Sequence, residues 1–314
     1  MAAALATPGG PPLAELIGQT REVCVAALGS EPLREAAERL EQSGFPRSSW
    51  IGLVEHFWRE ASFPAALVPV IETAPPTSVA RRLLLEAVLR ALDGFPEERL
   101  YEGVKTLLCD EFQFIAEPAA SLATWFDHGK YPLRMLSGYV LLERYPAGQL
   151  VFEPSGMPRS WIPKIRPADL PRFLMYFLRE GSFSPYYFVH LGVRRGKLPI
   201  LIERENDKSY YLMAKTMELR PEIRGILACS WLYYKDNHVS VSKNLRWVTE
   251  EMERNGALAT HIGEAAPDTG FLTGNPKRKE LYESGEWRPK QGLVIWPRKQ
   301  MLEWAARRPE LADA

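Results

Sequence analysis

The chain has 314 residues, of which 46% are hydrophobic and 25% are charged. These values are typical of folded globular proteins and exclude the disordered, fibrous and membrane-embedded classes. The 39 basic and 39 acidic side chains cancel, so no overall charge draws the chain toward nucleic acid or anionic lipid. Nucleic acid is therefore not an expected partner.

The cysteines and the first residues of the chain indicate the cellular compartment of the protein. Cys24, Cys109 and Cys229 are far apart and odd in number, which encodes neither a disulfide framework nor a clustered zinc site and favours a reducing compartment. Residues 1–12 lack the basic and apolar segments of a secretory signal and predict a disordered tail. The longest apolar run, 225–234, is about half of the roughly 20 residues of a membrane span. We expect a cytoplasmic protein with no membrane partner.

Residues 13–144 predict a helical domain, because apolar positions recur three and four residues apart. The clearest helix begins at Ser78, which caps its first turn, and ends at Gly94, where a left-handed residue is favoured. Its apolar stripe comprises Val79, Leu83, Leu84, Val88 and Leu92. Similar patterns predict helices over 33–43 and 100–109. Because these helices are short, each has to bury its stripe against the others in a bundle.

Residues 145–314 predict a mixed α/β domain, in which short apolar runs alternate with helices. The whole chain is thus expected to be an α+β protein. The run 223–234 does not alternate and lies between Pro221 and Asp236, which predicts a strand covered on both faces at the centre of the sheet. The other predicted elements are a helix opened by Asp169 and ended by Gly181, strands at 186–193 and 198–202, a helix at 207–219, a helix from Ser240 or Ser242 to 254, a strand at 257–262, a helix at 275–285, a strand at 292–296 and a helix at 300–307.

Three fragments of this second domain carry a family resemblance. Residues 275–285 combine an asparagine-opened helix with a Leu-Tyr-Glu element and a final glycine, and the strand around Val294 follows. Residues 165–170 and 221–225 match the entry into a first helix and part of a cofactor-binding segment. Together, over residues 150–298 at most, they resemble the GNAT-type N-acyltransferase fold.

The resemblance implies a reaction and a set of residues. It implies transfer of an acyl group from acyl-CoA or another acyl thioester to an amine of a small metabolite. Tyr282 would then be the general acid that protonates the leaving thiolate, and Arg224, Gly225, Asn275 and Arg278 would bind the cofactor. The sequence lacks the glycine-rich pyrophosphate loop of that family, because apolar residues follow Gly225 directly.

A base for the attacking amine is also required. Glu203, Glu205 and Asp236 lie near predicted strand ends, where the ligands of open sheets bind, and Glu203 is the first candidate. The alternative role for Tyr282 is to pack its helix against the sheet with the hydroxyl in water.

The buried strand contains one further candidate, Cys229. As a catalytic nucleophile it would need a base, and His190 and His261 are available for that role; the alternative is an inert core cysteine. A metal site would have to be assembled from His190, His238 and His261, because no short metal-binding spacing of His, Cys and Glu occurs.

Three basic segments are candidates for binding phosphate. They are residues 159–161, 194–197 and 277–279, and each combines arginine or lysine with a predicted loop or helix start. Their ligand would be a phosphorylated cofactor or an RNA acceptor. The alternative is a solvated surface whose arginines pair with nearby acids.

Two further functions remain open beside acyl transfer. One is a non-catalytic module that binds a ligand or a protein, and the other is a metal-dependent oxygenase or hydrolase. A small-molecule substrate, a protein partner on the helical domain and a homodimer are the expected partners.

Overall fold

The chain folds as an α+β protein, with helices first and a mixed sheet second, as predicted. The computed structural model describes residues 11–60, 62–73, 76–117, 130–179, 183, 185–192, 201–237, 246–264 and 276–312. One compact unit contains Met1–Val151 and Leu191–Ile200, and the other contains Phe152–His190 and Leu201–Ala312. Residues 1–10 of the predicted tail lie outside the described residues.

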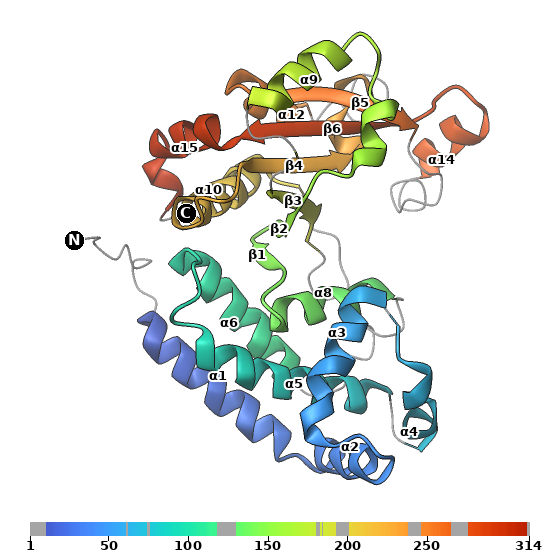
Figure 1. The fold of residues 1–314 in the computed structure, drawn as a ribbon, viewed down its shortest axis with the longest axis vertical. Helices are drawn as coiled ribbons and strands as arrows, with labels where there is room; N and C mark the ends of the chain where they lie inside the picture. The colour runs from blue at the N-terminus through green and yellow to red at the C-terminus, as the bar shows by residue number, and fades with distance from the viewer. Residues whose placement is uncertain are drawn as a thin grey trace. The chain divides into compact units, whose positions relative to one another are not determined.

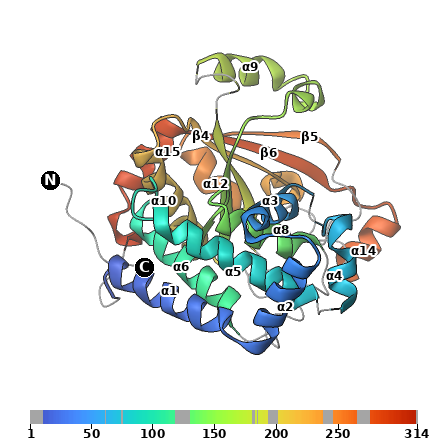
Figure 2. The same cartoon turned by 60° about the horizontal axis from the view of Figure 1, so that its bottom comes forward.

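The first unit is a bundle of helices around α5 (Figures 1 and 2). Its elements are α1 (Leu13–Leu28), α2 (Glu31–Gln42), α3 (Trp50–Glu60), α4 (Val68–Thr73), α5 (Pro76–Gly94), α6 (Glu102–Ala116), α8 (Lys130–Val140), β1 (Tyr145–Ala147) and the start of β2 (Leu150–Ser155). Helix α5 contacts α1, α2, α3, α6 and α8. Leu83, Leu84, Leu85 and Val88 are fully buried, so α5 is apolar on more of its surface than the predicted single stripe.

The predicted ends of α5 were wrong. The helix begins at Pro76 rather than at Ser78, because the first helical turn accepts proline without losing a hydrogen bond. Ser78 is buried inside the helix. Gly94 is the last helical residue, and it is not among the described glycines with positive φ, so this helix end does not use the left-handed conformation.

Two buried arginines of α5 donate hydrogen bonds to the last backbone carbonyl groups of neighbouring helices. Arg81 donates from Nε and Nη2 to the carbonyl oxygens of Ile115 (3.2 Å) and Ala116 (2.9 Å), at the end of α6. Arg82 donates from Nη1 to the carbonyl oxygen of Leu28 (3.2 Å), at the end of α1. The last carbonyl groups of a helix have no partner within that helix and carry its negative dipole. The arginines therefore supply both the missing donors and the complementary charge.

The second unit is organised around the sheet. Its elements are α9 (Leu170–Arg179), β3 (Tyr186–Leu191), α10 (Glu203–Leu219), β4 (Gly225–Ser230), α12 (Trp247–Arg254), β5 (Leu258–Glu264), α14 (Pro276–Glu283), β6 (Lys290–Pro297) and α15 (Arg298–Ala306), with short 3-10 turns at Arg159–Lys164, Trp231–Tyr233 and Pro309–Leu311. The strand order is β1-β2-β3-β4-β6-β5. Strands β3 and β4 are parallel, whereas β6 is antiparallel to both β4 and β5.

Helices cover both faces of this sheet (Figure 2). On one face, Phe173 and Phe177 of α9 pack into a core cluster with Leu227 and Ile295. On the other face, Trp296 contacts the rings of α10 and α15, and α15 contacts β4 and β6. Strand β4 is central and buried, as the apolar run 223–234 predicted.

The predicted length of that strand was wrong, since β4 ends at Ser230. The Ser230 hydroxyl accepts a hydrogen bond from the Leu232 backbone (3.3 Å) and starts a 3-10 turn. Trp231 and Tyr233 stay buried in that turn, which explains why the apolar run continues beyond the strand. The helix at 207–219 begins earlier, at Glu203, and most of the predicted strand 198–202 lies outside the described residues.

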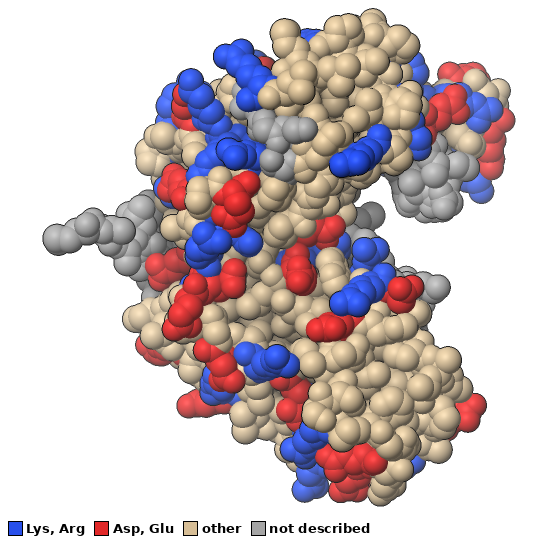
Figure 3. Space-filling view, viewed as in Figure 1, with Lys and Arg blue, Asp and Glu red and all other residues tan. Residues whose placement is uncertain are grey.

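The surface agrees with the neutral composition. On the face drawn in Figure 3, acidic and basic side chains are interspersed. Within the described residues, no helix combines the length and the apolarity that crossing a bilayer requires.

Candidate functional site

The parallel strands β3 and β4 are interior strands of the sheet, and their carboxyl ends lie side by side. Their ladder runs from Tyr187 and Ile226 to Val189 and Ala228, and the next residues in the two strands are His190 and Cys229. Both are partly exposed. Ligands of open sheets bind outside the carboxyl ends of the strands. We define the carboxyl-edge site by Glu153, Trp161, Phe188, His190, Cys229 and Gln291.

His190 and Glu153 form the polar centre of the carboxyl-edge site. His190 Nε2 lies 3.3 Å from Glu153 Oε1, and the two side chains are 25% and 16% exposed. A carboxylate beside Nε2 orients the imidazole and stabilises the positive charge that the ring gains when it accepts a proton. Phe188 contacts the His190 ring at 4.7 Å and Trp161 lies 5.8 Å from Phe188, so an aromatic surface adjoins the base.

Cys229 has the environment of an unreactive thiol. Its sulfur accepts a hydrogen bond from the Gln291 amide at 3.3 Å, and burial raises the thiol pKa to about 11. Because this pKa is far above 7, Cys229 stays protonated at neutral pH. Only the thiolate form of a cysteine is a nucleophile. The structure favours the core cysteine over the predicted nucleophile.

Arg224 and Gly225 lie at the opposite end of β4, roughly 16 Å along the strand from Ser230 at about 3.3 Å per residue. The Arg224 backbone donates to Pro185 (2.9 Å) and accepts from Arg298 (2.8 Å). A Cβ on Gly225 would lie 2.2 Å from the Trp296 carbonyl oxygen. The glycine therefore allows close packing of strands, and this segment does not fit a pyrophosphate.

Helix α14 lies off the end of the sheet where β6 begins (Figure 1). The Arg278 guanidinium lies 5.1 Å from the ring of Trp231, directly after β4, and burial lowers the Arg278 pKa. Tyr282 is half-buried, with the Arg288 guanidinium 4.7 Å from its ring. Asn275 lies outside the described residues. The fold thus brings α14 to the carboxyl end of β4.

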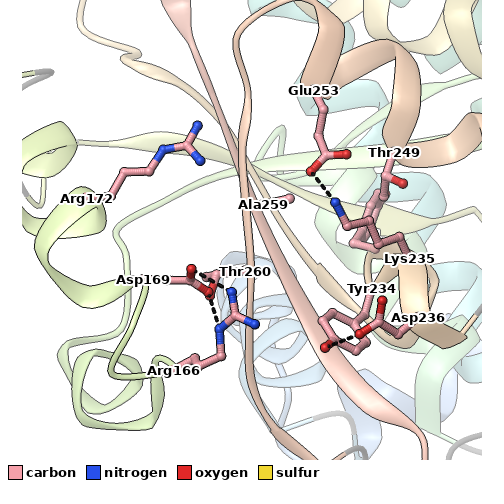
Figure 4. Close-up of a pocket in the computed structure, with 11 residues that line it drawn as sticks. Arg166, Asp169, Arg172, Tyr234, Lys235, Asp236, Thr249, Glu253, Ala259 and Thr260 are labelled. Atoms are coloured by element: carbon pink, nitrogen blue, oxygen red, sulfur yellow. Dashed lines mark hydrogen bonds and ion pairs between the residues drawn. The ribbon is translucent and has the colours of Figure 1, made fainter.

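A second site lies at edge strand β5, in a pocket of about 260 Å³ (Figure 4). We call it the edge pocket. It is lined by Arg166, Asp169, Arg172, Tyr233, Tyr234, Lys235, Asp236, Thr249, Glu253, Ala259 and Thr260. These residues come from the start of α9, the turn after β4, α12 and β5.

One wall of the edge pocket is a fixed ion pair. Arg166 donates from Nε (2.9 Å) and Nη2 (2.8 Å) to the two carboxylate oxygens of Asp169. The Thr260 hydroxyl donates to Asp169 Oδ2 at 2.7 Å. These side-chain hydrogen bonds, those of Arg166 first, lower the pKa of Asp169. Asp169 precedes α9 as predicted, but in the described hydrogen bonds its carboxylate accepts from side chains rather than from the helix backbone.

The opposite wall carries Asp236, one of the predicted bases. The Tyr234 hydroxyl donates to Asp236 Oδ2 at 2.6 Å, and Lys235 Nζ lies 3.9 Å from Glu253 Oε1. Burial raises the Tyr234 pKa to about 12, and Asp236 adds to this shift. The ring of His261 contacts Tyr234 at 5.0 Å. Burial lowers the His261 pKa, as do Lys290 and Arg166, so this histidine is neutral at pH 7.

Neither of the two remaining predicted bases lines the carboxyl-edge site or the edge pocket. Glu203 is exposed and Glu205 half-buried in the first turn of α10. His238 and the basic segment 194–197 lie outside the described residues. Among the residues that the structure describes, no three His, Cys, Asp or Glu side chains gather in a geometry suited to a metal ion.

Several site residues escaped the sequence analysis. Glu153 and Glu253 are carboxylates in ordinary contexts, and their partners come from distant elements. Arg172 is one of several exposed arginines. The Arg166 and Asp169 pair did carry a signal, because residues three apart at a helix entry are neighbours.

Replacing Asp169 by Asn should lower thermal stability in a pH-dependent way. The folded-state pKa of Asp169 is depressed, so its contribution is present above the unfolded value of about 3.9 and is lost as the pH falls through the folded value. The difference in melting temperature between wild type and Asp169→Asn should be largest at pH 7 and should disappear as the pH falls below 4. Asp93→Asn, in an exposed pair with Arg21, is the control. A gap that is constant with pH would contradict the assigned hydrogen bonds.

No protein-family model, curated protein or solved structure matches this chain. The geometry of the two sites and the order of the elements around them are therefore the features that bear on function.

Proposed function

We propose that the protein transfers an acyl group from a thioester donor to an amine of a small metabolite at the carboxyl-edge site. From α9 to α15 the described helices and strands follow the predicted order apart from the strand at 198–202, and this order supports the proposal. The observation that carries it is the His190–Glu153 pair, which supplies an oriented base beside the end of the only parallel strand pair for which the described residues give a register.

The chemical roles follow from position. The amine nitrogen attacks the thioester carbonyl carbon while the His190 imidazole takes its proton, and Glu153 stabilises the imidazolium. Backbone N–H groups beyond the ladder in β4 would donate to the oxyanion. The carbon–sulfur bond then breaks, the amide forms, and the thiolate takes a proton from Tyr282. Trp161 and Phe188 offer an apolar surface to the acyl chain.

The donor is defined by its thioester rather than by a nucleotide. The segment at Arg224 and Gly225 does not fit a pyrophosphate, and it lies at the wrong end of β4. A donor that lacks the nucleotide should therefore react as well as one that carries it.

The test is direct detection of the amide product by mass spectrometry. The purified protein is incubated with acetyl-CoA or with S-acetyl-N-acetylcysteamine, which lacks the nucleotide, together with a panel of primary amines. Product from either donor above the uncatalysed rate supports the proposal. Failure of both donors with every amine in the panel, and of longer acyl chains, would overturn it.

Replacing Tyr282 by Phe should lower turnover by more than about tenfold without changing the fold, because the leaving thiolate loses its proton donor. Glu283→Gln, an exposed change on the same helix, is the matched control and should leave turnover unaltered. Equal turnover of Tyr282→Phe and wild type would restrict Tyr282 to a packing role.

The second candidate is a binding module without chemistry, which the raised pKa of Cys229 and the missing glycine loop favour. In that case a ligand binds to the second unit and no amide forms. The metal-dependent alternative is tested by elemental analysis of the purified protein. A protein partner and a homodimer remain proposals for the helical unit, where Val23 and Val25 of α1 are exposed.

A further inference from the structure

We infer that the edge pocket binds a small zwitterion that carries a carboxylate and an ammonium group, such as a free α-amino acid. This inference does not depend on the proposed transfer reaction. Four side chains carry the argument: Arg172, Asp236, Lys235 and Glu253.

The charges that line the pocket exclude a strongly charged ligand. Three cations, Arg166, Arg172 and Lys235, face three anions, Asp169, Asp236 and Glu253. A phosphate would meet three carboxylates, and a simple amine would meet three cations. A ligand with one charge of each sign fits this balance.

The pairing within the pocket shows which charges remain for a ligand. Arg166 and Asp169 satisfy each other through two short hydrogen bonds. Arg172 forms no hydrogen bond or ion pair among the residues that the structure describes. Within the described part of the chain, the Asp236 carboxylate accepts one hydrogen bond, from Tyr234, and the Glu253 carboxylate has only the contact to Lys235 at 3.9 Å. The guanidinium of Arg172 is therefore the carboxylate anchor, and Asp236 with Glu253 is the ammonium anchor.

The geometry allows one small molecule to reach both anchors. Figure 4 shows Arg172 on one side of β5 and Glu253, Lys235 and Asp236 on the other, with Ala259 between them. The short Ala259 side chain leaves space at this point. The volume of about 260 Å³ lies below the range of about 300–1,000 Å³ for drug-sized ligands, which suits a molecule of amino-acid size.

The edge pocket is distinct from the carboxyl-edge site. Thr260 pairs with Leu293, which pairs with Cys229, and His190 lies one strand beyond. Three strand spacings of about 4.8 Å separate Thr260 from His190 by roughly 14 Å. A bound amino acid is too short to bridge this distance to His190.

Calorimetry with each of the twenty common L-amino acids tests the inference on the full-length protein. We expect at least one to bind, and its methyl ester and its Nα-acetyl derivative to bind more than tenfold more weakly. Arg172→Gln and Asp236→Asn should each weaken binding at least tenfold. Arg179→Gln, an exposed arginine on the same helix, and His190→Gln should leave binding unchanged.

Several results would overturn it: no heat with any of the twenty, equal binding of either derivative, or retained affinity in both pocket variants. Binding that survives His190→Gln while amide formation is lost would separate this site from the proposed transferase.

Discussion

Replacing His190 by Gln should reduce amide formation by about a hundredfold or more while the protein stays folded. General base catalysis by a positioned side chain contributes roughly 10²–10⁴-fold, and glutamine keeps the size and a polar contact to Glu153 without a basic nitrogen. The rate is measured with acetyl-CoA and the best amine of the panel. His56→Gln, a half-buried histidine on α3 in the helical unit, is the matched control and should act like wild type.

A substitution of Glu153, the partner of His190, tests the same claim independently. Glu153→Gln removes the carboxylate at Nε2, so turnover should fall less than in His190→Gln and the pH profile should shift. Folding is checked by circular dichroism. Should His190→Gln keep more than half of the wild-type rate, His190 is not the base and the proposed mechanism fails.

Replacing Gly225 by Ala should destabilise the protein by about 4 kcal/mol, because overpacking and a strained backbone add their costs. Gly225 has φ 148°, and a Cβ there would meet the Trp296 carbonyl oxygen at 2.2 Å. Backbone atoms of paired strands cannot move apart without breaking the ladder between β4 and β6. Urea unfolding measures the loss.

Gly263→Ala is the matched control for this substitution. Gly263 also has positive φ, 102°, but a Cβ added there would meet no described atom within 4 Å. Gly263→Ala should lower the free energy of unfolding only by the cost of the strained backbone, about 1–3 kcal/mol. Equal losses in the two variants would show that close packing does not explain Gly225, and wild-type stability in Gly225→Ala would contradict the strand register.

Local patterns predicted the parts of the fold that depend on neighbouring residues. The left-handed glycines Gly256 and Gly285 end α12 and α14 as the sequence indicated, because glycine alone adopts that conformation at low cost. The unbroken apolar run predicted the central strand. Its end at Ser230 was missed, because Trp231 and Tyr233 remain buried in a turn that follows.

The sites depend on contacts that local patterns do not contain. His190 was among the candidates, but its partner Glu153 comes from β2, and only the strand order places them together. Arg224 and Gly225 matched a short motif whose loop is absent, and the sheet uses the glycine for packing. Asp236 was proposed as a base at a strand end, and it lies in the edge pocket with Tyr234 instead.

Hydrogen exchange followed by mass spectrometry, with and without S-acetyl-N-acetylcysteamine and acetyl-CoA, tests most directly whether the carboxyl-edge site binds an acyl thioester. We predict slower exchange in peptides that cover 186–190 and 226–233, with less effect in His190→Gln than in wild type at equal donor concentration. Unchanged exchange in those peptides at saturating donor, or protection confined to other parts of the chain, would contradict the proposed function.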